Sequence, residues 1–184
     1  ATISGNVASN GNGNAIALTG KIENVTIKNS EISSTASGIA SVIYANYGTG
    51  PINLDLENVD VVNKAAANTT NAIYSGLAGT FTAKDCTFHD SNGRIYFPKA
   101  TEMSFTNCQF LNNDASYSSA IAPVYLESGN ASFTDCTFTG NKGYTAGALY
   151  NKSKGAVTIN GCLFTQNNAT TYTAAGALYV KEET

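Results

Sequence analysis

The stretch DCTFTGNKGYTAGALY, residues 135–150, decides the fold, because the chain soon repeats it as GCLFTQNNATTYTAAGALY, residues 161–179. Both stretches contain Cys-x-Phe, an Asn three residues after the Phe, and then Ala-Gly-Ala-Leu-Tyr. A chemical motif used twice would give this pattern, and so would one turn of a scaffold seen twice. The spacing of the cysteines distinguishes the two.

The four cysteines mark a repeat that extends over most of the chain. Cys86, Cys108, Cys136 and Cys162 lie 22, 28 and 26 residues apart. Each has apolar residues three and five positions before it and a phenylalanine two positions after it: Phe88, Phe110, Phe138 and Phe164. Two earlier segments fit the same pattern with Ser30 and Val59 at the cysteine position. A period of this length is typical of a solenoid.

Each repeat contains a predicted change of direction just before its cysteine position. Apolar residues alternate on both sides of this point, which indicates two strands with a buried face. The residue before the cysteine position belongs to types that tolerate a left-handed backbone: Asn29, Asn58, Asp85, Asn107, Asp135 and Gly161. We therefore expect a sharp corner between two strands that face one interior.

A third strand is predicted in every repeat, where an aliphatic residue precedes a tyrosine. Three short strands, one fixed corner and one loop of variable length predict an all-β, right-handed parallel β-helix of about six coils. We expect residues 1–184 to be a single β-helix segment of a longer protein. A β-sandwich also uses many short strands, but it does not explain why residue types recur at one coil position.

Composition argues against several function classes. The chain is 42% hydrophobic but only 12% charged, and its net charge is −3. No basic cluster suggests a nucleic-acid partner, and no apolar run is long enough to span a membrane. One histidine and no Cys-x-x-Cys argue against a zinc site, so no metal and no cofactor are expected. In a β-helix the cysteines are expected to form an inward column. They are expected to be inert buried thiols. Disulfides are the alternative, but parallel side chains hold neighbouring Cβ atoms too far apart to favour them.

The tyrosines are the candidate binding residues. Alternation places one outward file along the rod: Tyr44, Tyr74, Tyr96, Tyr125, Tyr150 and Tyr179. Aromatic rings with polar tips suit a sugar face or a protein partner. Two structural explanations stay open, because loops could cover the file or stacked rings could simply stabilise the sheet.

No catalytic residue is assigned. The segment HDSNGR, with His89, Asp90 and Arg94, is expected to be a solvated loop tip, and the acidic residues are scattered along the chain. The repeated Asn113, Asn141 and Asn167 are expected to bond the turn backbone and one another. Three or more charged side chains in one groove would favour an enzyme, whereas a tyrosine-lined face poor in charge would favour adhesion.

The motifs CTFTGN…AGALY and CLFTQN…AGALY resemble the F-x-x-N and G-G-A-[ILV] repeats of polymorphic membrane proteins and adhesin-like right-handed β-helix proteins. The match is clearest from Met103 to Val180, with Ala-Gly in place of Gly-Gly. The resemblance implies an extracellular or cell-surface protein that contacts a glycan or protein on a host or neighbouring cell.

The leading hypothesis is therefore a non-catalytic, adhesin-like segment that binds through the tyrosine file and the loops. A polysaccharide lyase or hydrolase, or a fragment of one, is the alternative from another class, and a structural spacer is the third. Open coil ends are also expected to allow self-association, because unpaired strand edges pair readily with another chain.

Overall fold

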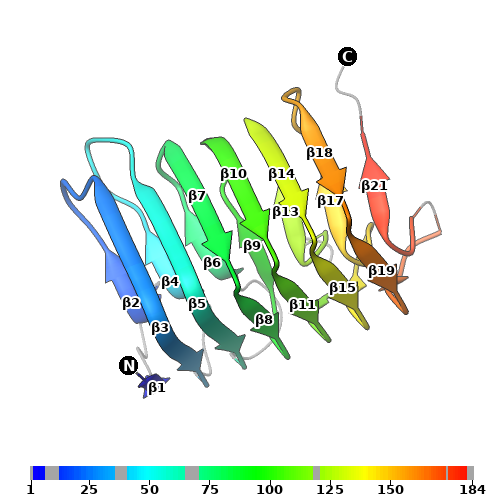
Figure 1. The fold of residues 1–184 in the computed structure, drawn as a ribbon, viewed down its shortest axis with the longest axis horizontal. Helices are drawn as coiled ribbons and strands as arrows, with labels where there is room; N and C mark the ends of the chain where they lie inside the picture. Colours follow the sequence, from blue (N-terminus) through cyan, green and yellow to red (C-terminus); the bar gives the residue numbers. More distant parts are fainter. Residues whose placement is uncertain are drawn as a thin grey trace.

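The computed structural model describes residues 2–6, 13–35, 41–64, 71–117, 121–172 and 174–181, and the regular structure of these residues is all β-strand. The strands lie side by side along a rod, with the two termini at opposite ends (Figure 1). Neighbouring strands are parallel, and each pairs with the equivalent strand of the next coil. The structure is thus a parallel solenoid of about six turns, which confirms the predicted fold class.

Three sheets form the walls of the rod. The sheet with eleven strands, here the broad sheet, contains β1 (Thr2–Asn6), β3 (Asn24–Ser34), β5 (Asn53–Asn63), β7 (Gly79–Lys84), β8 (Thr87–His89), β10 (Ala100–Thr106), β11 (Gln109–Leu111), β14 (Asn130–Thr134), β15 (Thr137–Thr139), β18 (Val157–Asn160) and β19 (Leu163–Thr165). The sheet with seven strands, here the tyrosine sheet, contains β2 (Gly13–Leu18), β4 (Ser41–Ala45), β6 (Asn71–Ser75), β9 (Arg94–Tyr96), β13 (Val124–Leu126), β17 (Leu149–Asn151) and β21 (Leu178–Val180). The short sheet contains β12 (Asp114–Ala115), β16 (Lys142–Gly143) and β20 (Asn168–Ala169).

The residue before each cysteine position is left-handed, as predicted. The φ angles lie between 49° and 64° for Asn29, Asn58, Asp85, Asn107, Asp135 and Gly161. The predicted sharp corner is nevertheless wrong, because the strands on both sides of this residue belong to the broad sheet. β3 and β5 run straight through it, and β5 pairs with both β7 and β8. The residue interrupts the side-chain alternation but not the pairing, since Lys28 and Ser30 stay in register with Glu57 and Val59 of the next coil.

The chain leaves the broad sheet four residues after the cysteine position, at a second left-handed residue that the sequence analysis missed. The φ angles there are 45° to 66°, for Asp90, Asn112, Gly140 and Gln166. The residue type varies more at this turn than before the cysteine position, and this variation hides the turn in the sequence. In the coils that contain β12, β16 and β20, the turn leads to a strand of two residues in the short sheet.

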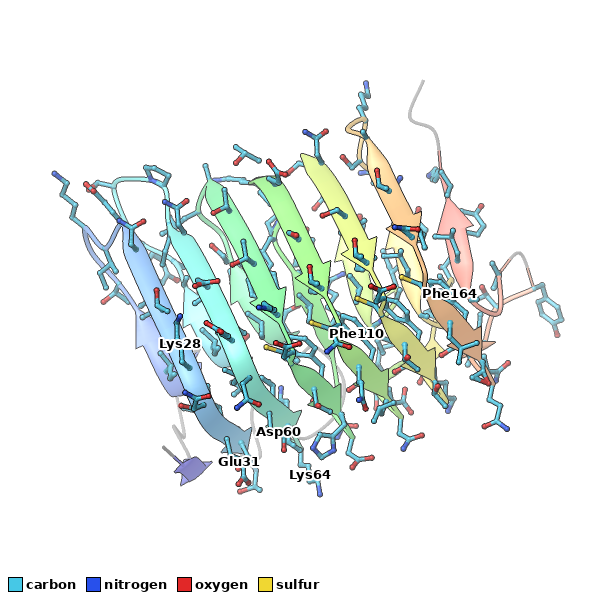
Figure 2. All side chains as sticks on the ribbon, viewed as in Figure 1. Lys28, Glu31, Asp60, Lys64, Phe110 and Phe164 are labelled. Atoms are coloured by element: carbon cyan, nitrogen blue, oxygen red, sulfur yellow. The ribbon has the colours of Figure 1, made fainter. Side chains whose placement is uncertain are left out.

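The inward side chains form one continuous core between the broad sheet and the tyrosine sheet. The rings of Phe110, Phe138 and Phe164 stack in successive coils with centroids 4.4 and 4.6 Å apart. Figure 2 shows Phe110 and Phe164 on this column, at two levels of the rod. The cysteines are free thiols, three of them buried and Cys162 partly buried, as the thiol interpretation predicts. Hydrogen bonding to the thiols of the neighbouring coils and burial raise the pKa of Cys108, which keeps this thiol unreactive.

The repeated asparagines form a buried column beside the phenylalanines. The Asn141 Nδ2 donates to the Asn167 Oδ1 at 2.9 Å and to the Phe110 carbonyl at 2.7 Å. The Asn113 Nδ2 makes the matching bond to Asn141, also at 2.9 Å. These bonds satisfy the turn backbone and link successive coils, which confirms the structural role predicted for these residues.

Candidate functional site

The six tyrosines of the predicted file stand on the outer face of the tyrosine sheet. They are Cα partners from coil to coil, and neighbouring ring centroids lie 5.0 to 5.9 Å apart. The aliphatic residue before each of the first five tyrosines is buried in the core, as the predicted alternation requires, whereas Leu178 before Tyr179 is 37% exposed in the last coil. The structure therefore brings all six residues together: Tyr44, Tyr74, Tyr96, Tyr125, Tyr150 and Tyr179.

Part of this file is covered. Tyr125 and Tyr150 are each only 6% exposed, and they form a second apolar cluster with Ala122 and Ala146. Both alanines belong to the segments that lead into β13 and β17. The other four tyrosines are partly buried. A ligand role for the file stays a prediction. Tyr125 and Tyr150 could contact a ligand only if the segments with Ala122 and Ala146 moved away from them.

Arg94 also belongs to the tyrosine sheet, and its predicted place in a solvated loop tip is wrong. Its guanidinium lies 3.9 Å from the centroid of the Tyr96 ring, and its Nε donates to the Asn71 Oδ1 at 3.0 Å. The Tyr96 hydroxyl donates to Glu127, and burial together with this bond raises the pKa of Tyr96. Glu127 in turn lies 3.5 Å from the Lys152 Nζ. This network holds the middle of the file, so Tyr96 has a structural role there.

His89 lies at the end of β8, on the outer face of the broad sheet. Its Nδ1 is 2.9 Å from the Asp90 Oδ2, and its Nε2 is 3.0 Å from the Asp60 Oδ1 on the neighbouring coil. Burial lowers the pKa of His89, but the hydrogen bonds and charges of the two carboxylates outweigh this effect and raise it above its ordinary value. His89 is therefore a link between two coils and not a solvated loop residue.

An open groove of about 400 Å³ crosses the broad sheet next to this link. Eight residues line it: Asn29, Ser30, Glu31, Asn58, Val59, Asp60, Asp85 and Thr87. A second hollow shares Glu31 and Asp60 and adds Lys64 and His89. Figure 2 shows Glu31, Asp60 and Lys64 on β3 and β5 and at the end of β5. We call this region, defined by Glu31, Asp60, Lys64, Asp85 and His89, the charged groove.

The charged groove gathers residues that look scattered in the sequence. Glu31 and Asp60 are Cα partners on β3 and β5, and Asp60 in turn pairs with Thr87 on β8. Glu31 and Asp60 each follow the cysteine position of their coil by one residue. Aligning the charged residues on those positions would have predicted this juxtaposition, because alternation points both side chains outward.

The comparisons with known proteins agree with this geometry. A family model described as a right-handed β-helix region matches residues 23–184. The chain belongs to the right-handed β-helix family. No curated protein and no solved structure gave a match. The family membership supports the handedness expected from the sequence.

Two surfaces of this right-handed β-helix are candidate ligand sites, and they lie on different sheets. The charged groove offers carboxylates and carboxamides, whereas the tyrosine file offers aromatic faces. Among the described residues, no three His, Cys, Asp or Glu side chains are grouped so as to hold a metal ion. The same part of the chain contains no helix suited to crossing a membrane.

Proposed function

We propose that this right-handed β-helix is a non-catalytic binding segment of an adhesin-like protein that acts outside the cell. Its partner is a glycan or a protein on a host or neighbouring cell. The resemblance of its F-x-x-N and A-G-A-L-Y repeats to polymorphic membrane proteins supports this proposal. The rod-like fold also supports it, because a stack of coils holds loops and side chains along an extended surface.

The observation that carries the proposal is the pairing of charges around the groove. His89 contacts Asp60 on the neighbouring coil and also Asp90, and the Lys28 Nζ lies 2.5 Å from Glu57, again between coils. A general base must have a nitrogen free to accept a proton, whereas both ring nitrogens of His89 contact carboxylates, at 3.0 Å and 2.9 Å. The charged side chains thus tie neighbouring coils together.

A carbohydrate-active enzyme is the second candidate, and one observation favours it. Glu31, Asp60 and Asp85 line one groove, which is the convergence expected of an enzyme. Glycosidases use pairs of carboxyl groups. However, a carboxyl group that donates a proton near neutral pH needs a pocket with little water. The Asp60 side chain is 44% exposed in an open groove, so the geometry favours binding over catalysis.

The test measures binding and turnover on one preparation. The chain is applied to a glycan array and to cells, and the release of reducing ends or unsaturated sugars is followed on a panel of polysaccharides. Asp60→Asn is compared with Asp114→Asn, whose carboxylate pairs with Lys142 away from the groove. We expect binding without any product. Product formation that Asp60→Asn abolishes and Asp114→Asn retains would establish the enzyme instead, and a lack of both activities would leave a spacer.

A further inference from the structure

We propose that Tyr47, with Tyr44 and Tyr74, forms a carbohydrate-binding platform at the N-terminal end of the tyrosine file. The platform accepts the face of a neutral pyranose ring. This inference rests on the proposed binding function, for which it specifies a site and a ligand class. Four observations carry it: a strained backbone, an exposed ring, a clamped loop and the chemistry of the neighbouring side chains.

The backbone of Tyr47 has a conformation that suits glycine. Its φ is 58°, in the left-handed region that bulky residues rarely occupy. Ala17 is the Cα partner of Tyr44, so Gly20 occupies the equivalent position one coil earlier, and its φ is 88°. The chain thus has a glycine at this turn in one coil and a tyrosine in the next. A residue strained in this way points to a role other than folding.

Packing of the ring does not offset this strain. Tyr47 is 72% exposed, and its centroid lies 6.5 Å from that of Tyr44 at an interplanar angle of 49°. Tyr44 and Tyr74 behind it are stacked at 5.3 Å with an angle of only 19°. An exposed ring therefore stands beside a stacked pair, which is a surface for contact with another molecule.

The loop that carries Tyr47 is held between the loops of the adjacent coils. A Cβ atom at Gly48 would lie 2.6 Å from the Gly20 carbonyl oxygen, and one at Gly76 would lie 2.8 Å from the Asn46 Oδ1. The Gly76 amide donates to the Ala45 carbonyl at 2.9 Å. Glycines allow this close layering, so the ring is presented by a backbone that need not be ordered on binding.

The chemistry of the loop indicates a neutral sugar. The Asn46 Nδ2 donates to the Tyr44 hydroxyl at 2.9 Å, which places an amide and a phenol next to the rings. Pyranose rings have a C–H face that packs on an aromatic ring and hydroxyl groups that bond to such polar tips. The segment 46–50, Asn-Tyr-Gly-Thr-Gly, contains no charge to attract a uronic acid or a sulfated sugar.

The experiment compares two changes of Tyr47 with a matched control. Tyr47→Gly removes the ring and suits the left-handed backbone, whereas Tyr47→Ala removes the ring and keeps the strain. Tyr172→Ala is the control, because it removes a different loop tyrosine, one that is fully exposed. The full chain is titrated calorimetrically with cellohexaose, maltohexaose and chitohexaose. We expect binding of at least one hexaose, weakened tenfold or more by both Tyr47 changes and less than twofold by Tyr172→Ala.

Thermal unfolding of the same variants supplies a second readout. We expect Tyr47→Gly to have a higher Tm than Tyr47→Ala and at least the Tm of the native chain. A lower Tm for Tyr47→Gly than for the native chain would mean that the ring serves folding, which overturns the inference. Hexaose binding that both Tyr47 changes leave intact would overturn the platform but not the binding function. Binding to cells without hexaose binding would overturn the sugar assignment, and no binding of either kind would overturn the proposed function as well.

Discussion

Asp135 has an exposed side chain and a left-handed backbone with a φ of 54°. Asn58 and Asn107 have nearly the same φ at the equivalent positions of their coils. Short polar residues reach this conformation at lower cost than β-branched residues do. The backbone therefore needs Asn, Asp or Gly before each cysteine position, because the chain is left-handed there.

Replacing Asp135 by Val should lower the free energy of unfolding by about 1–2 kcal/mol, because a β-branched side chain is strained at this φ. Asp135→Gly should lower the free energy of unfolding by far less. Thr137→Val, two residues later in β15, is the control and should stay within about 0.5 kcal/mol of the native chain. Urea unfolding followed by far-UV circular dichroism measures all three. Equal effects of the two valine changes would contradict the requirement for a left-handed residue at position 135.

His89 should make stability depend on pH. Its pKa is raised in the folded state above the unfolded value near 6.5, so its stabilising contribution is complete below that value and is lost as the pH rises through the folded-state pKa. The free energy of unfolding of the native chain should be higher than that of His89→Gln by about 1 kcal/mol at pH 5.5 and by much less at pH 8.5. Unfolding measurements at both pH values give this difference. Lys142→Gln, which breaks the pair with Asp114, is the control, and its effect on the free energy of unfolding should be the same at both pH values. An effect of His89→Gln that grew with pH would contradict the stabilising contact between His89 and Asp60.

The stacked column is the element that connects the coils. Phe138 is fully buried and has a parallel ring on each side, from Phe110 and from Phe164. Asn141 is likewise fully buried and bonded on both sides. Each coil therefore depends on both of its neighbours, and the last coil has only one.

Phe138→Ala should lower the free energy of unfolding by about 3–5 kcal/mol, the usual range for removing a buried phenylalanine. Phe164→Ala should cost roughly half as much, because Phe164 is only partly buried and stacks on one side in this chain. Denaturant unfolding of the two variants tests the comparison. Equal losses would mean that the last coil is as well packed as an interior one.

The sequence predicted the residues of these columns better than it predicted the path between them. Phe138, Cys136 and Asn141 occupy the expected positions, because periodicity reports which side chains share a face. The corner at Asp135 was misplaced for a related reason. Left-handed residues occur both within the broad sheet and at the turns that leave it, and only strand pairing shows that β14 and β15 lie in the same sheet.

At the scale of the whole molecule, the last coil of the described rod differs from the middle coils. Ile159 is 36% exposed in the last coil, whereas its equivalents Phe105 and Phe133 are fully buried. Val180 is 65% exposed, whereas its equivalents Leu126 and Asn151 are buried. An apolar coil end with free strand edges can pair with another chain.

The 184-residue chain should therefore self-associate at high concentration. Val180→Lys should shift it toward the monomer, because a charge at the end of the rod opposes stacking. Thr139→Lys adds the same charge on the side of an interior coil and should leave association unchanged. Light scattering during size-exclusion chromatography measures the mass of each variant. A native chain that is monomeric at every concentration would contradict this prediction.

The sequence by itself determined the fold, because a period shared by Cys, Phe and Asn fixes which residues stack and which face inward. It also determined that the tyrosines form one file. Only the tertiary structure decided which of these rings are accessible and which charges meet. Ala122 packs against Tyr125, and this contact depends on the path of the segment before β13. Asp60 contacts His89, which lies 29 positions later in the sequence. Local periodicity describes one coil, whereas accessibility and charge pairing depend on the register between coils.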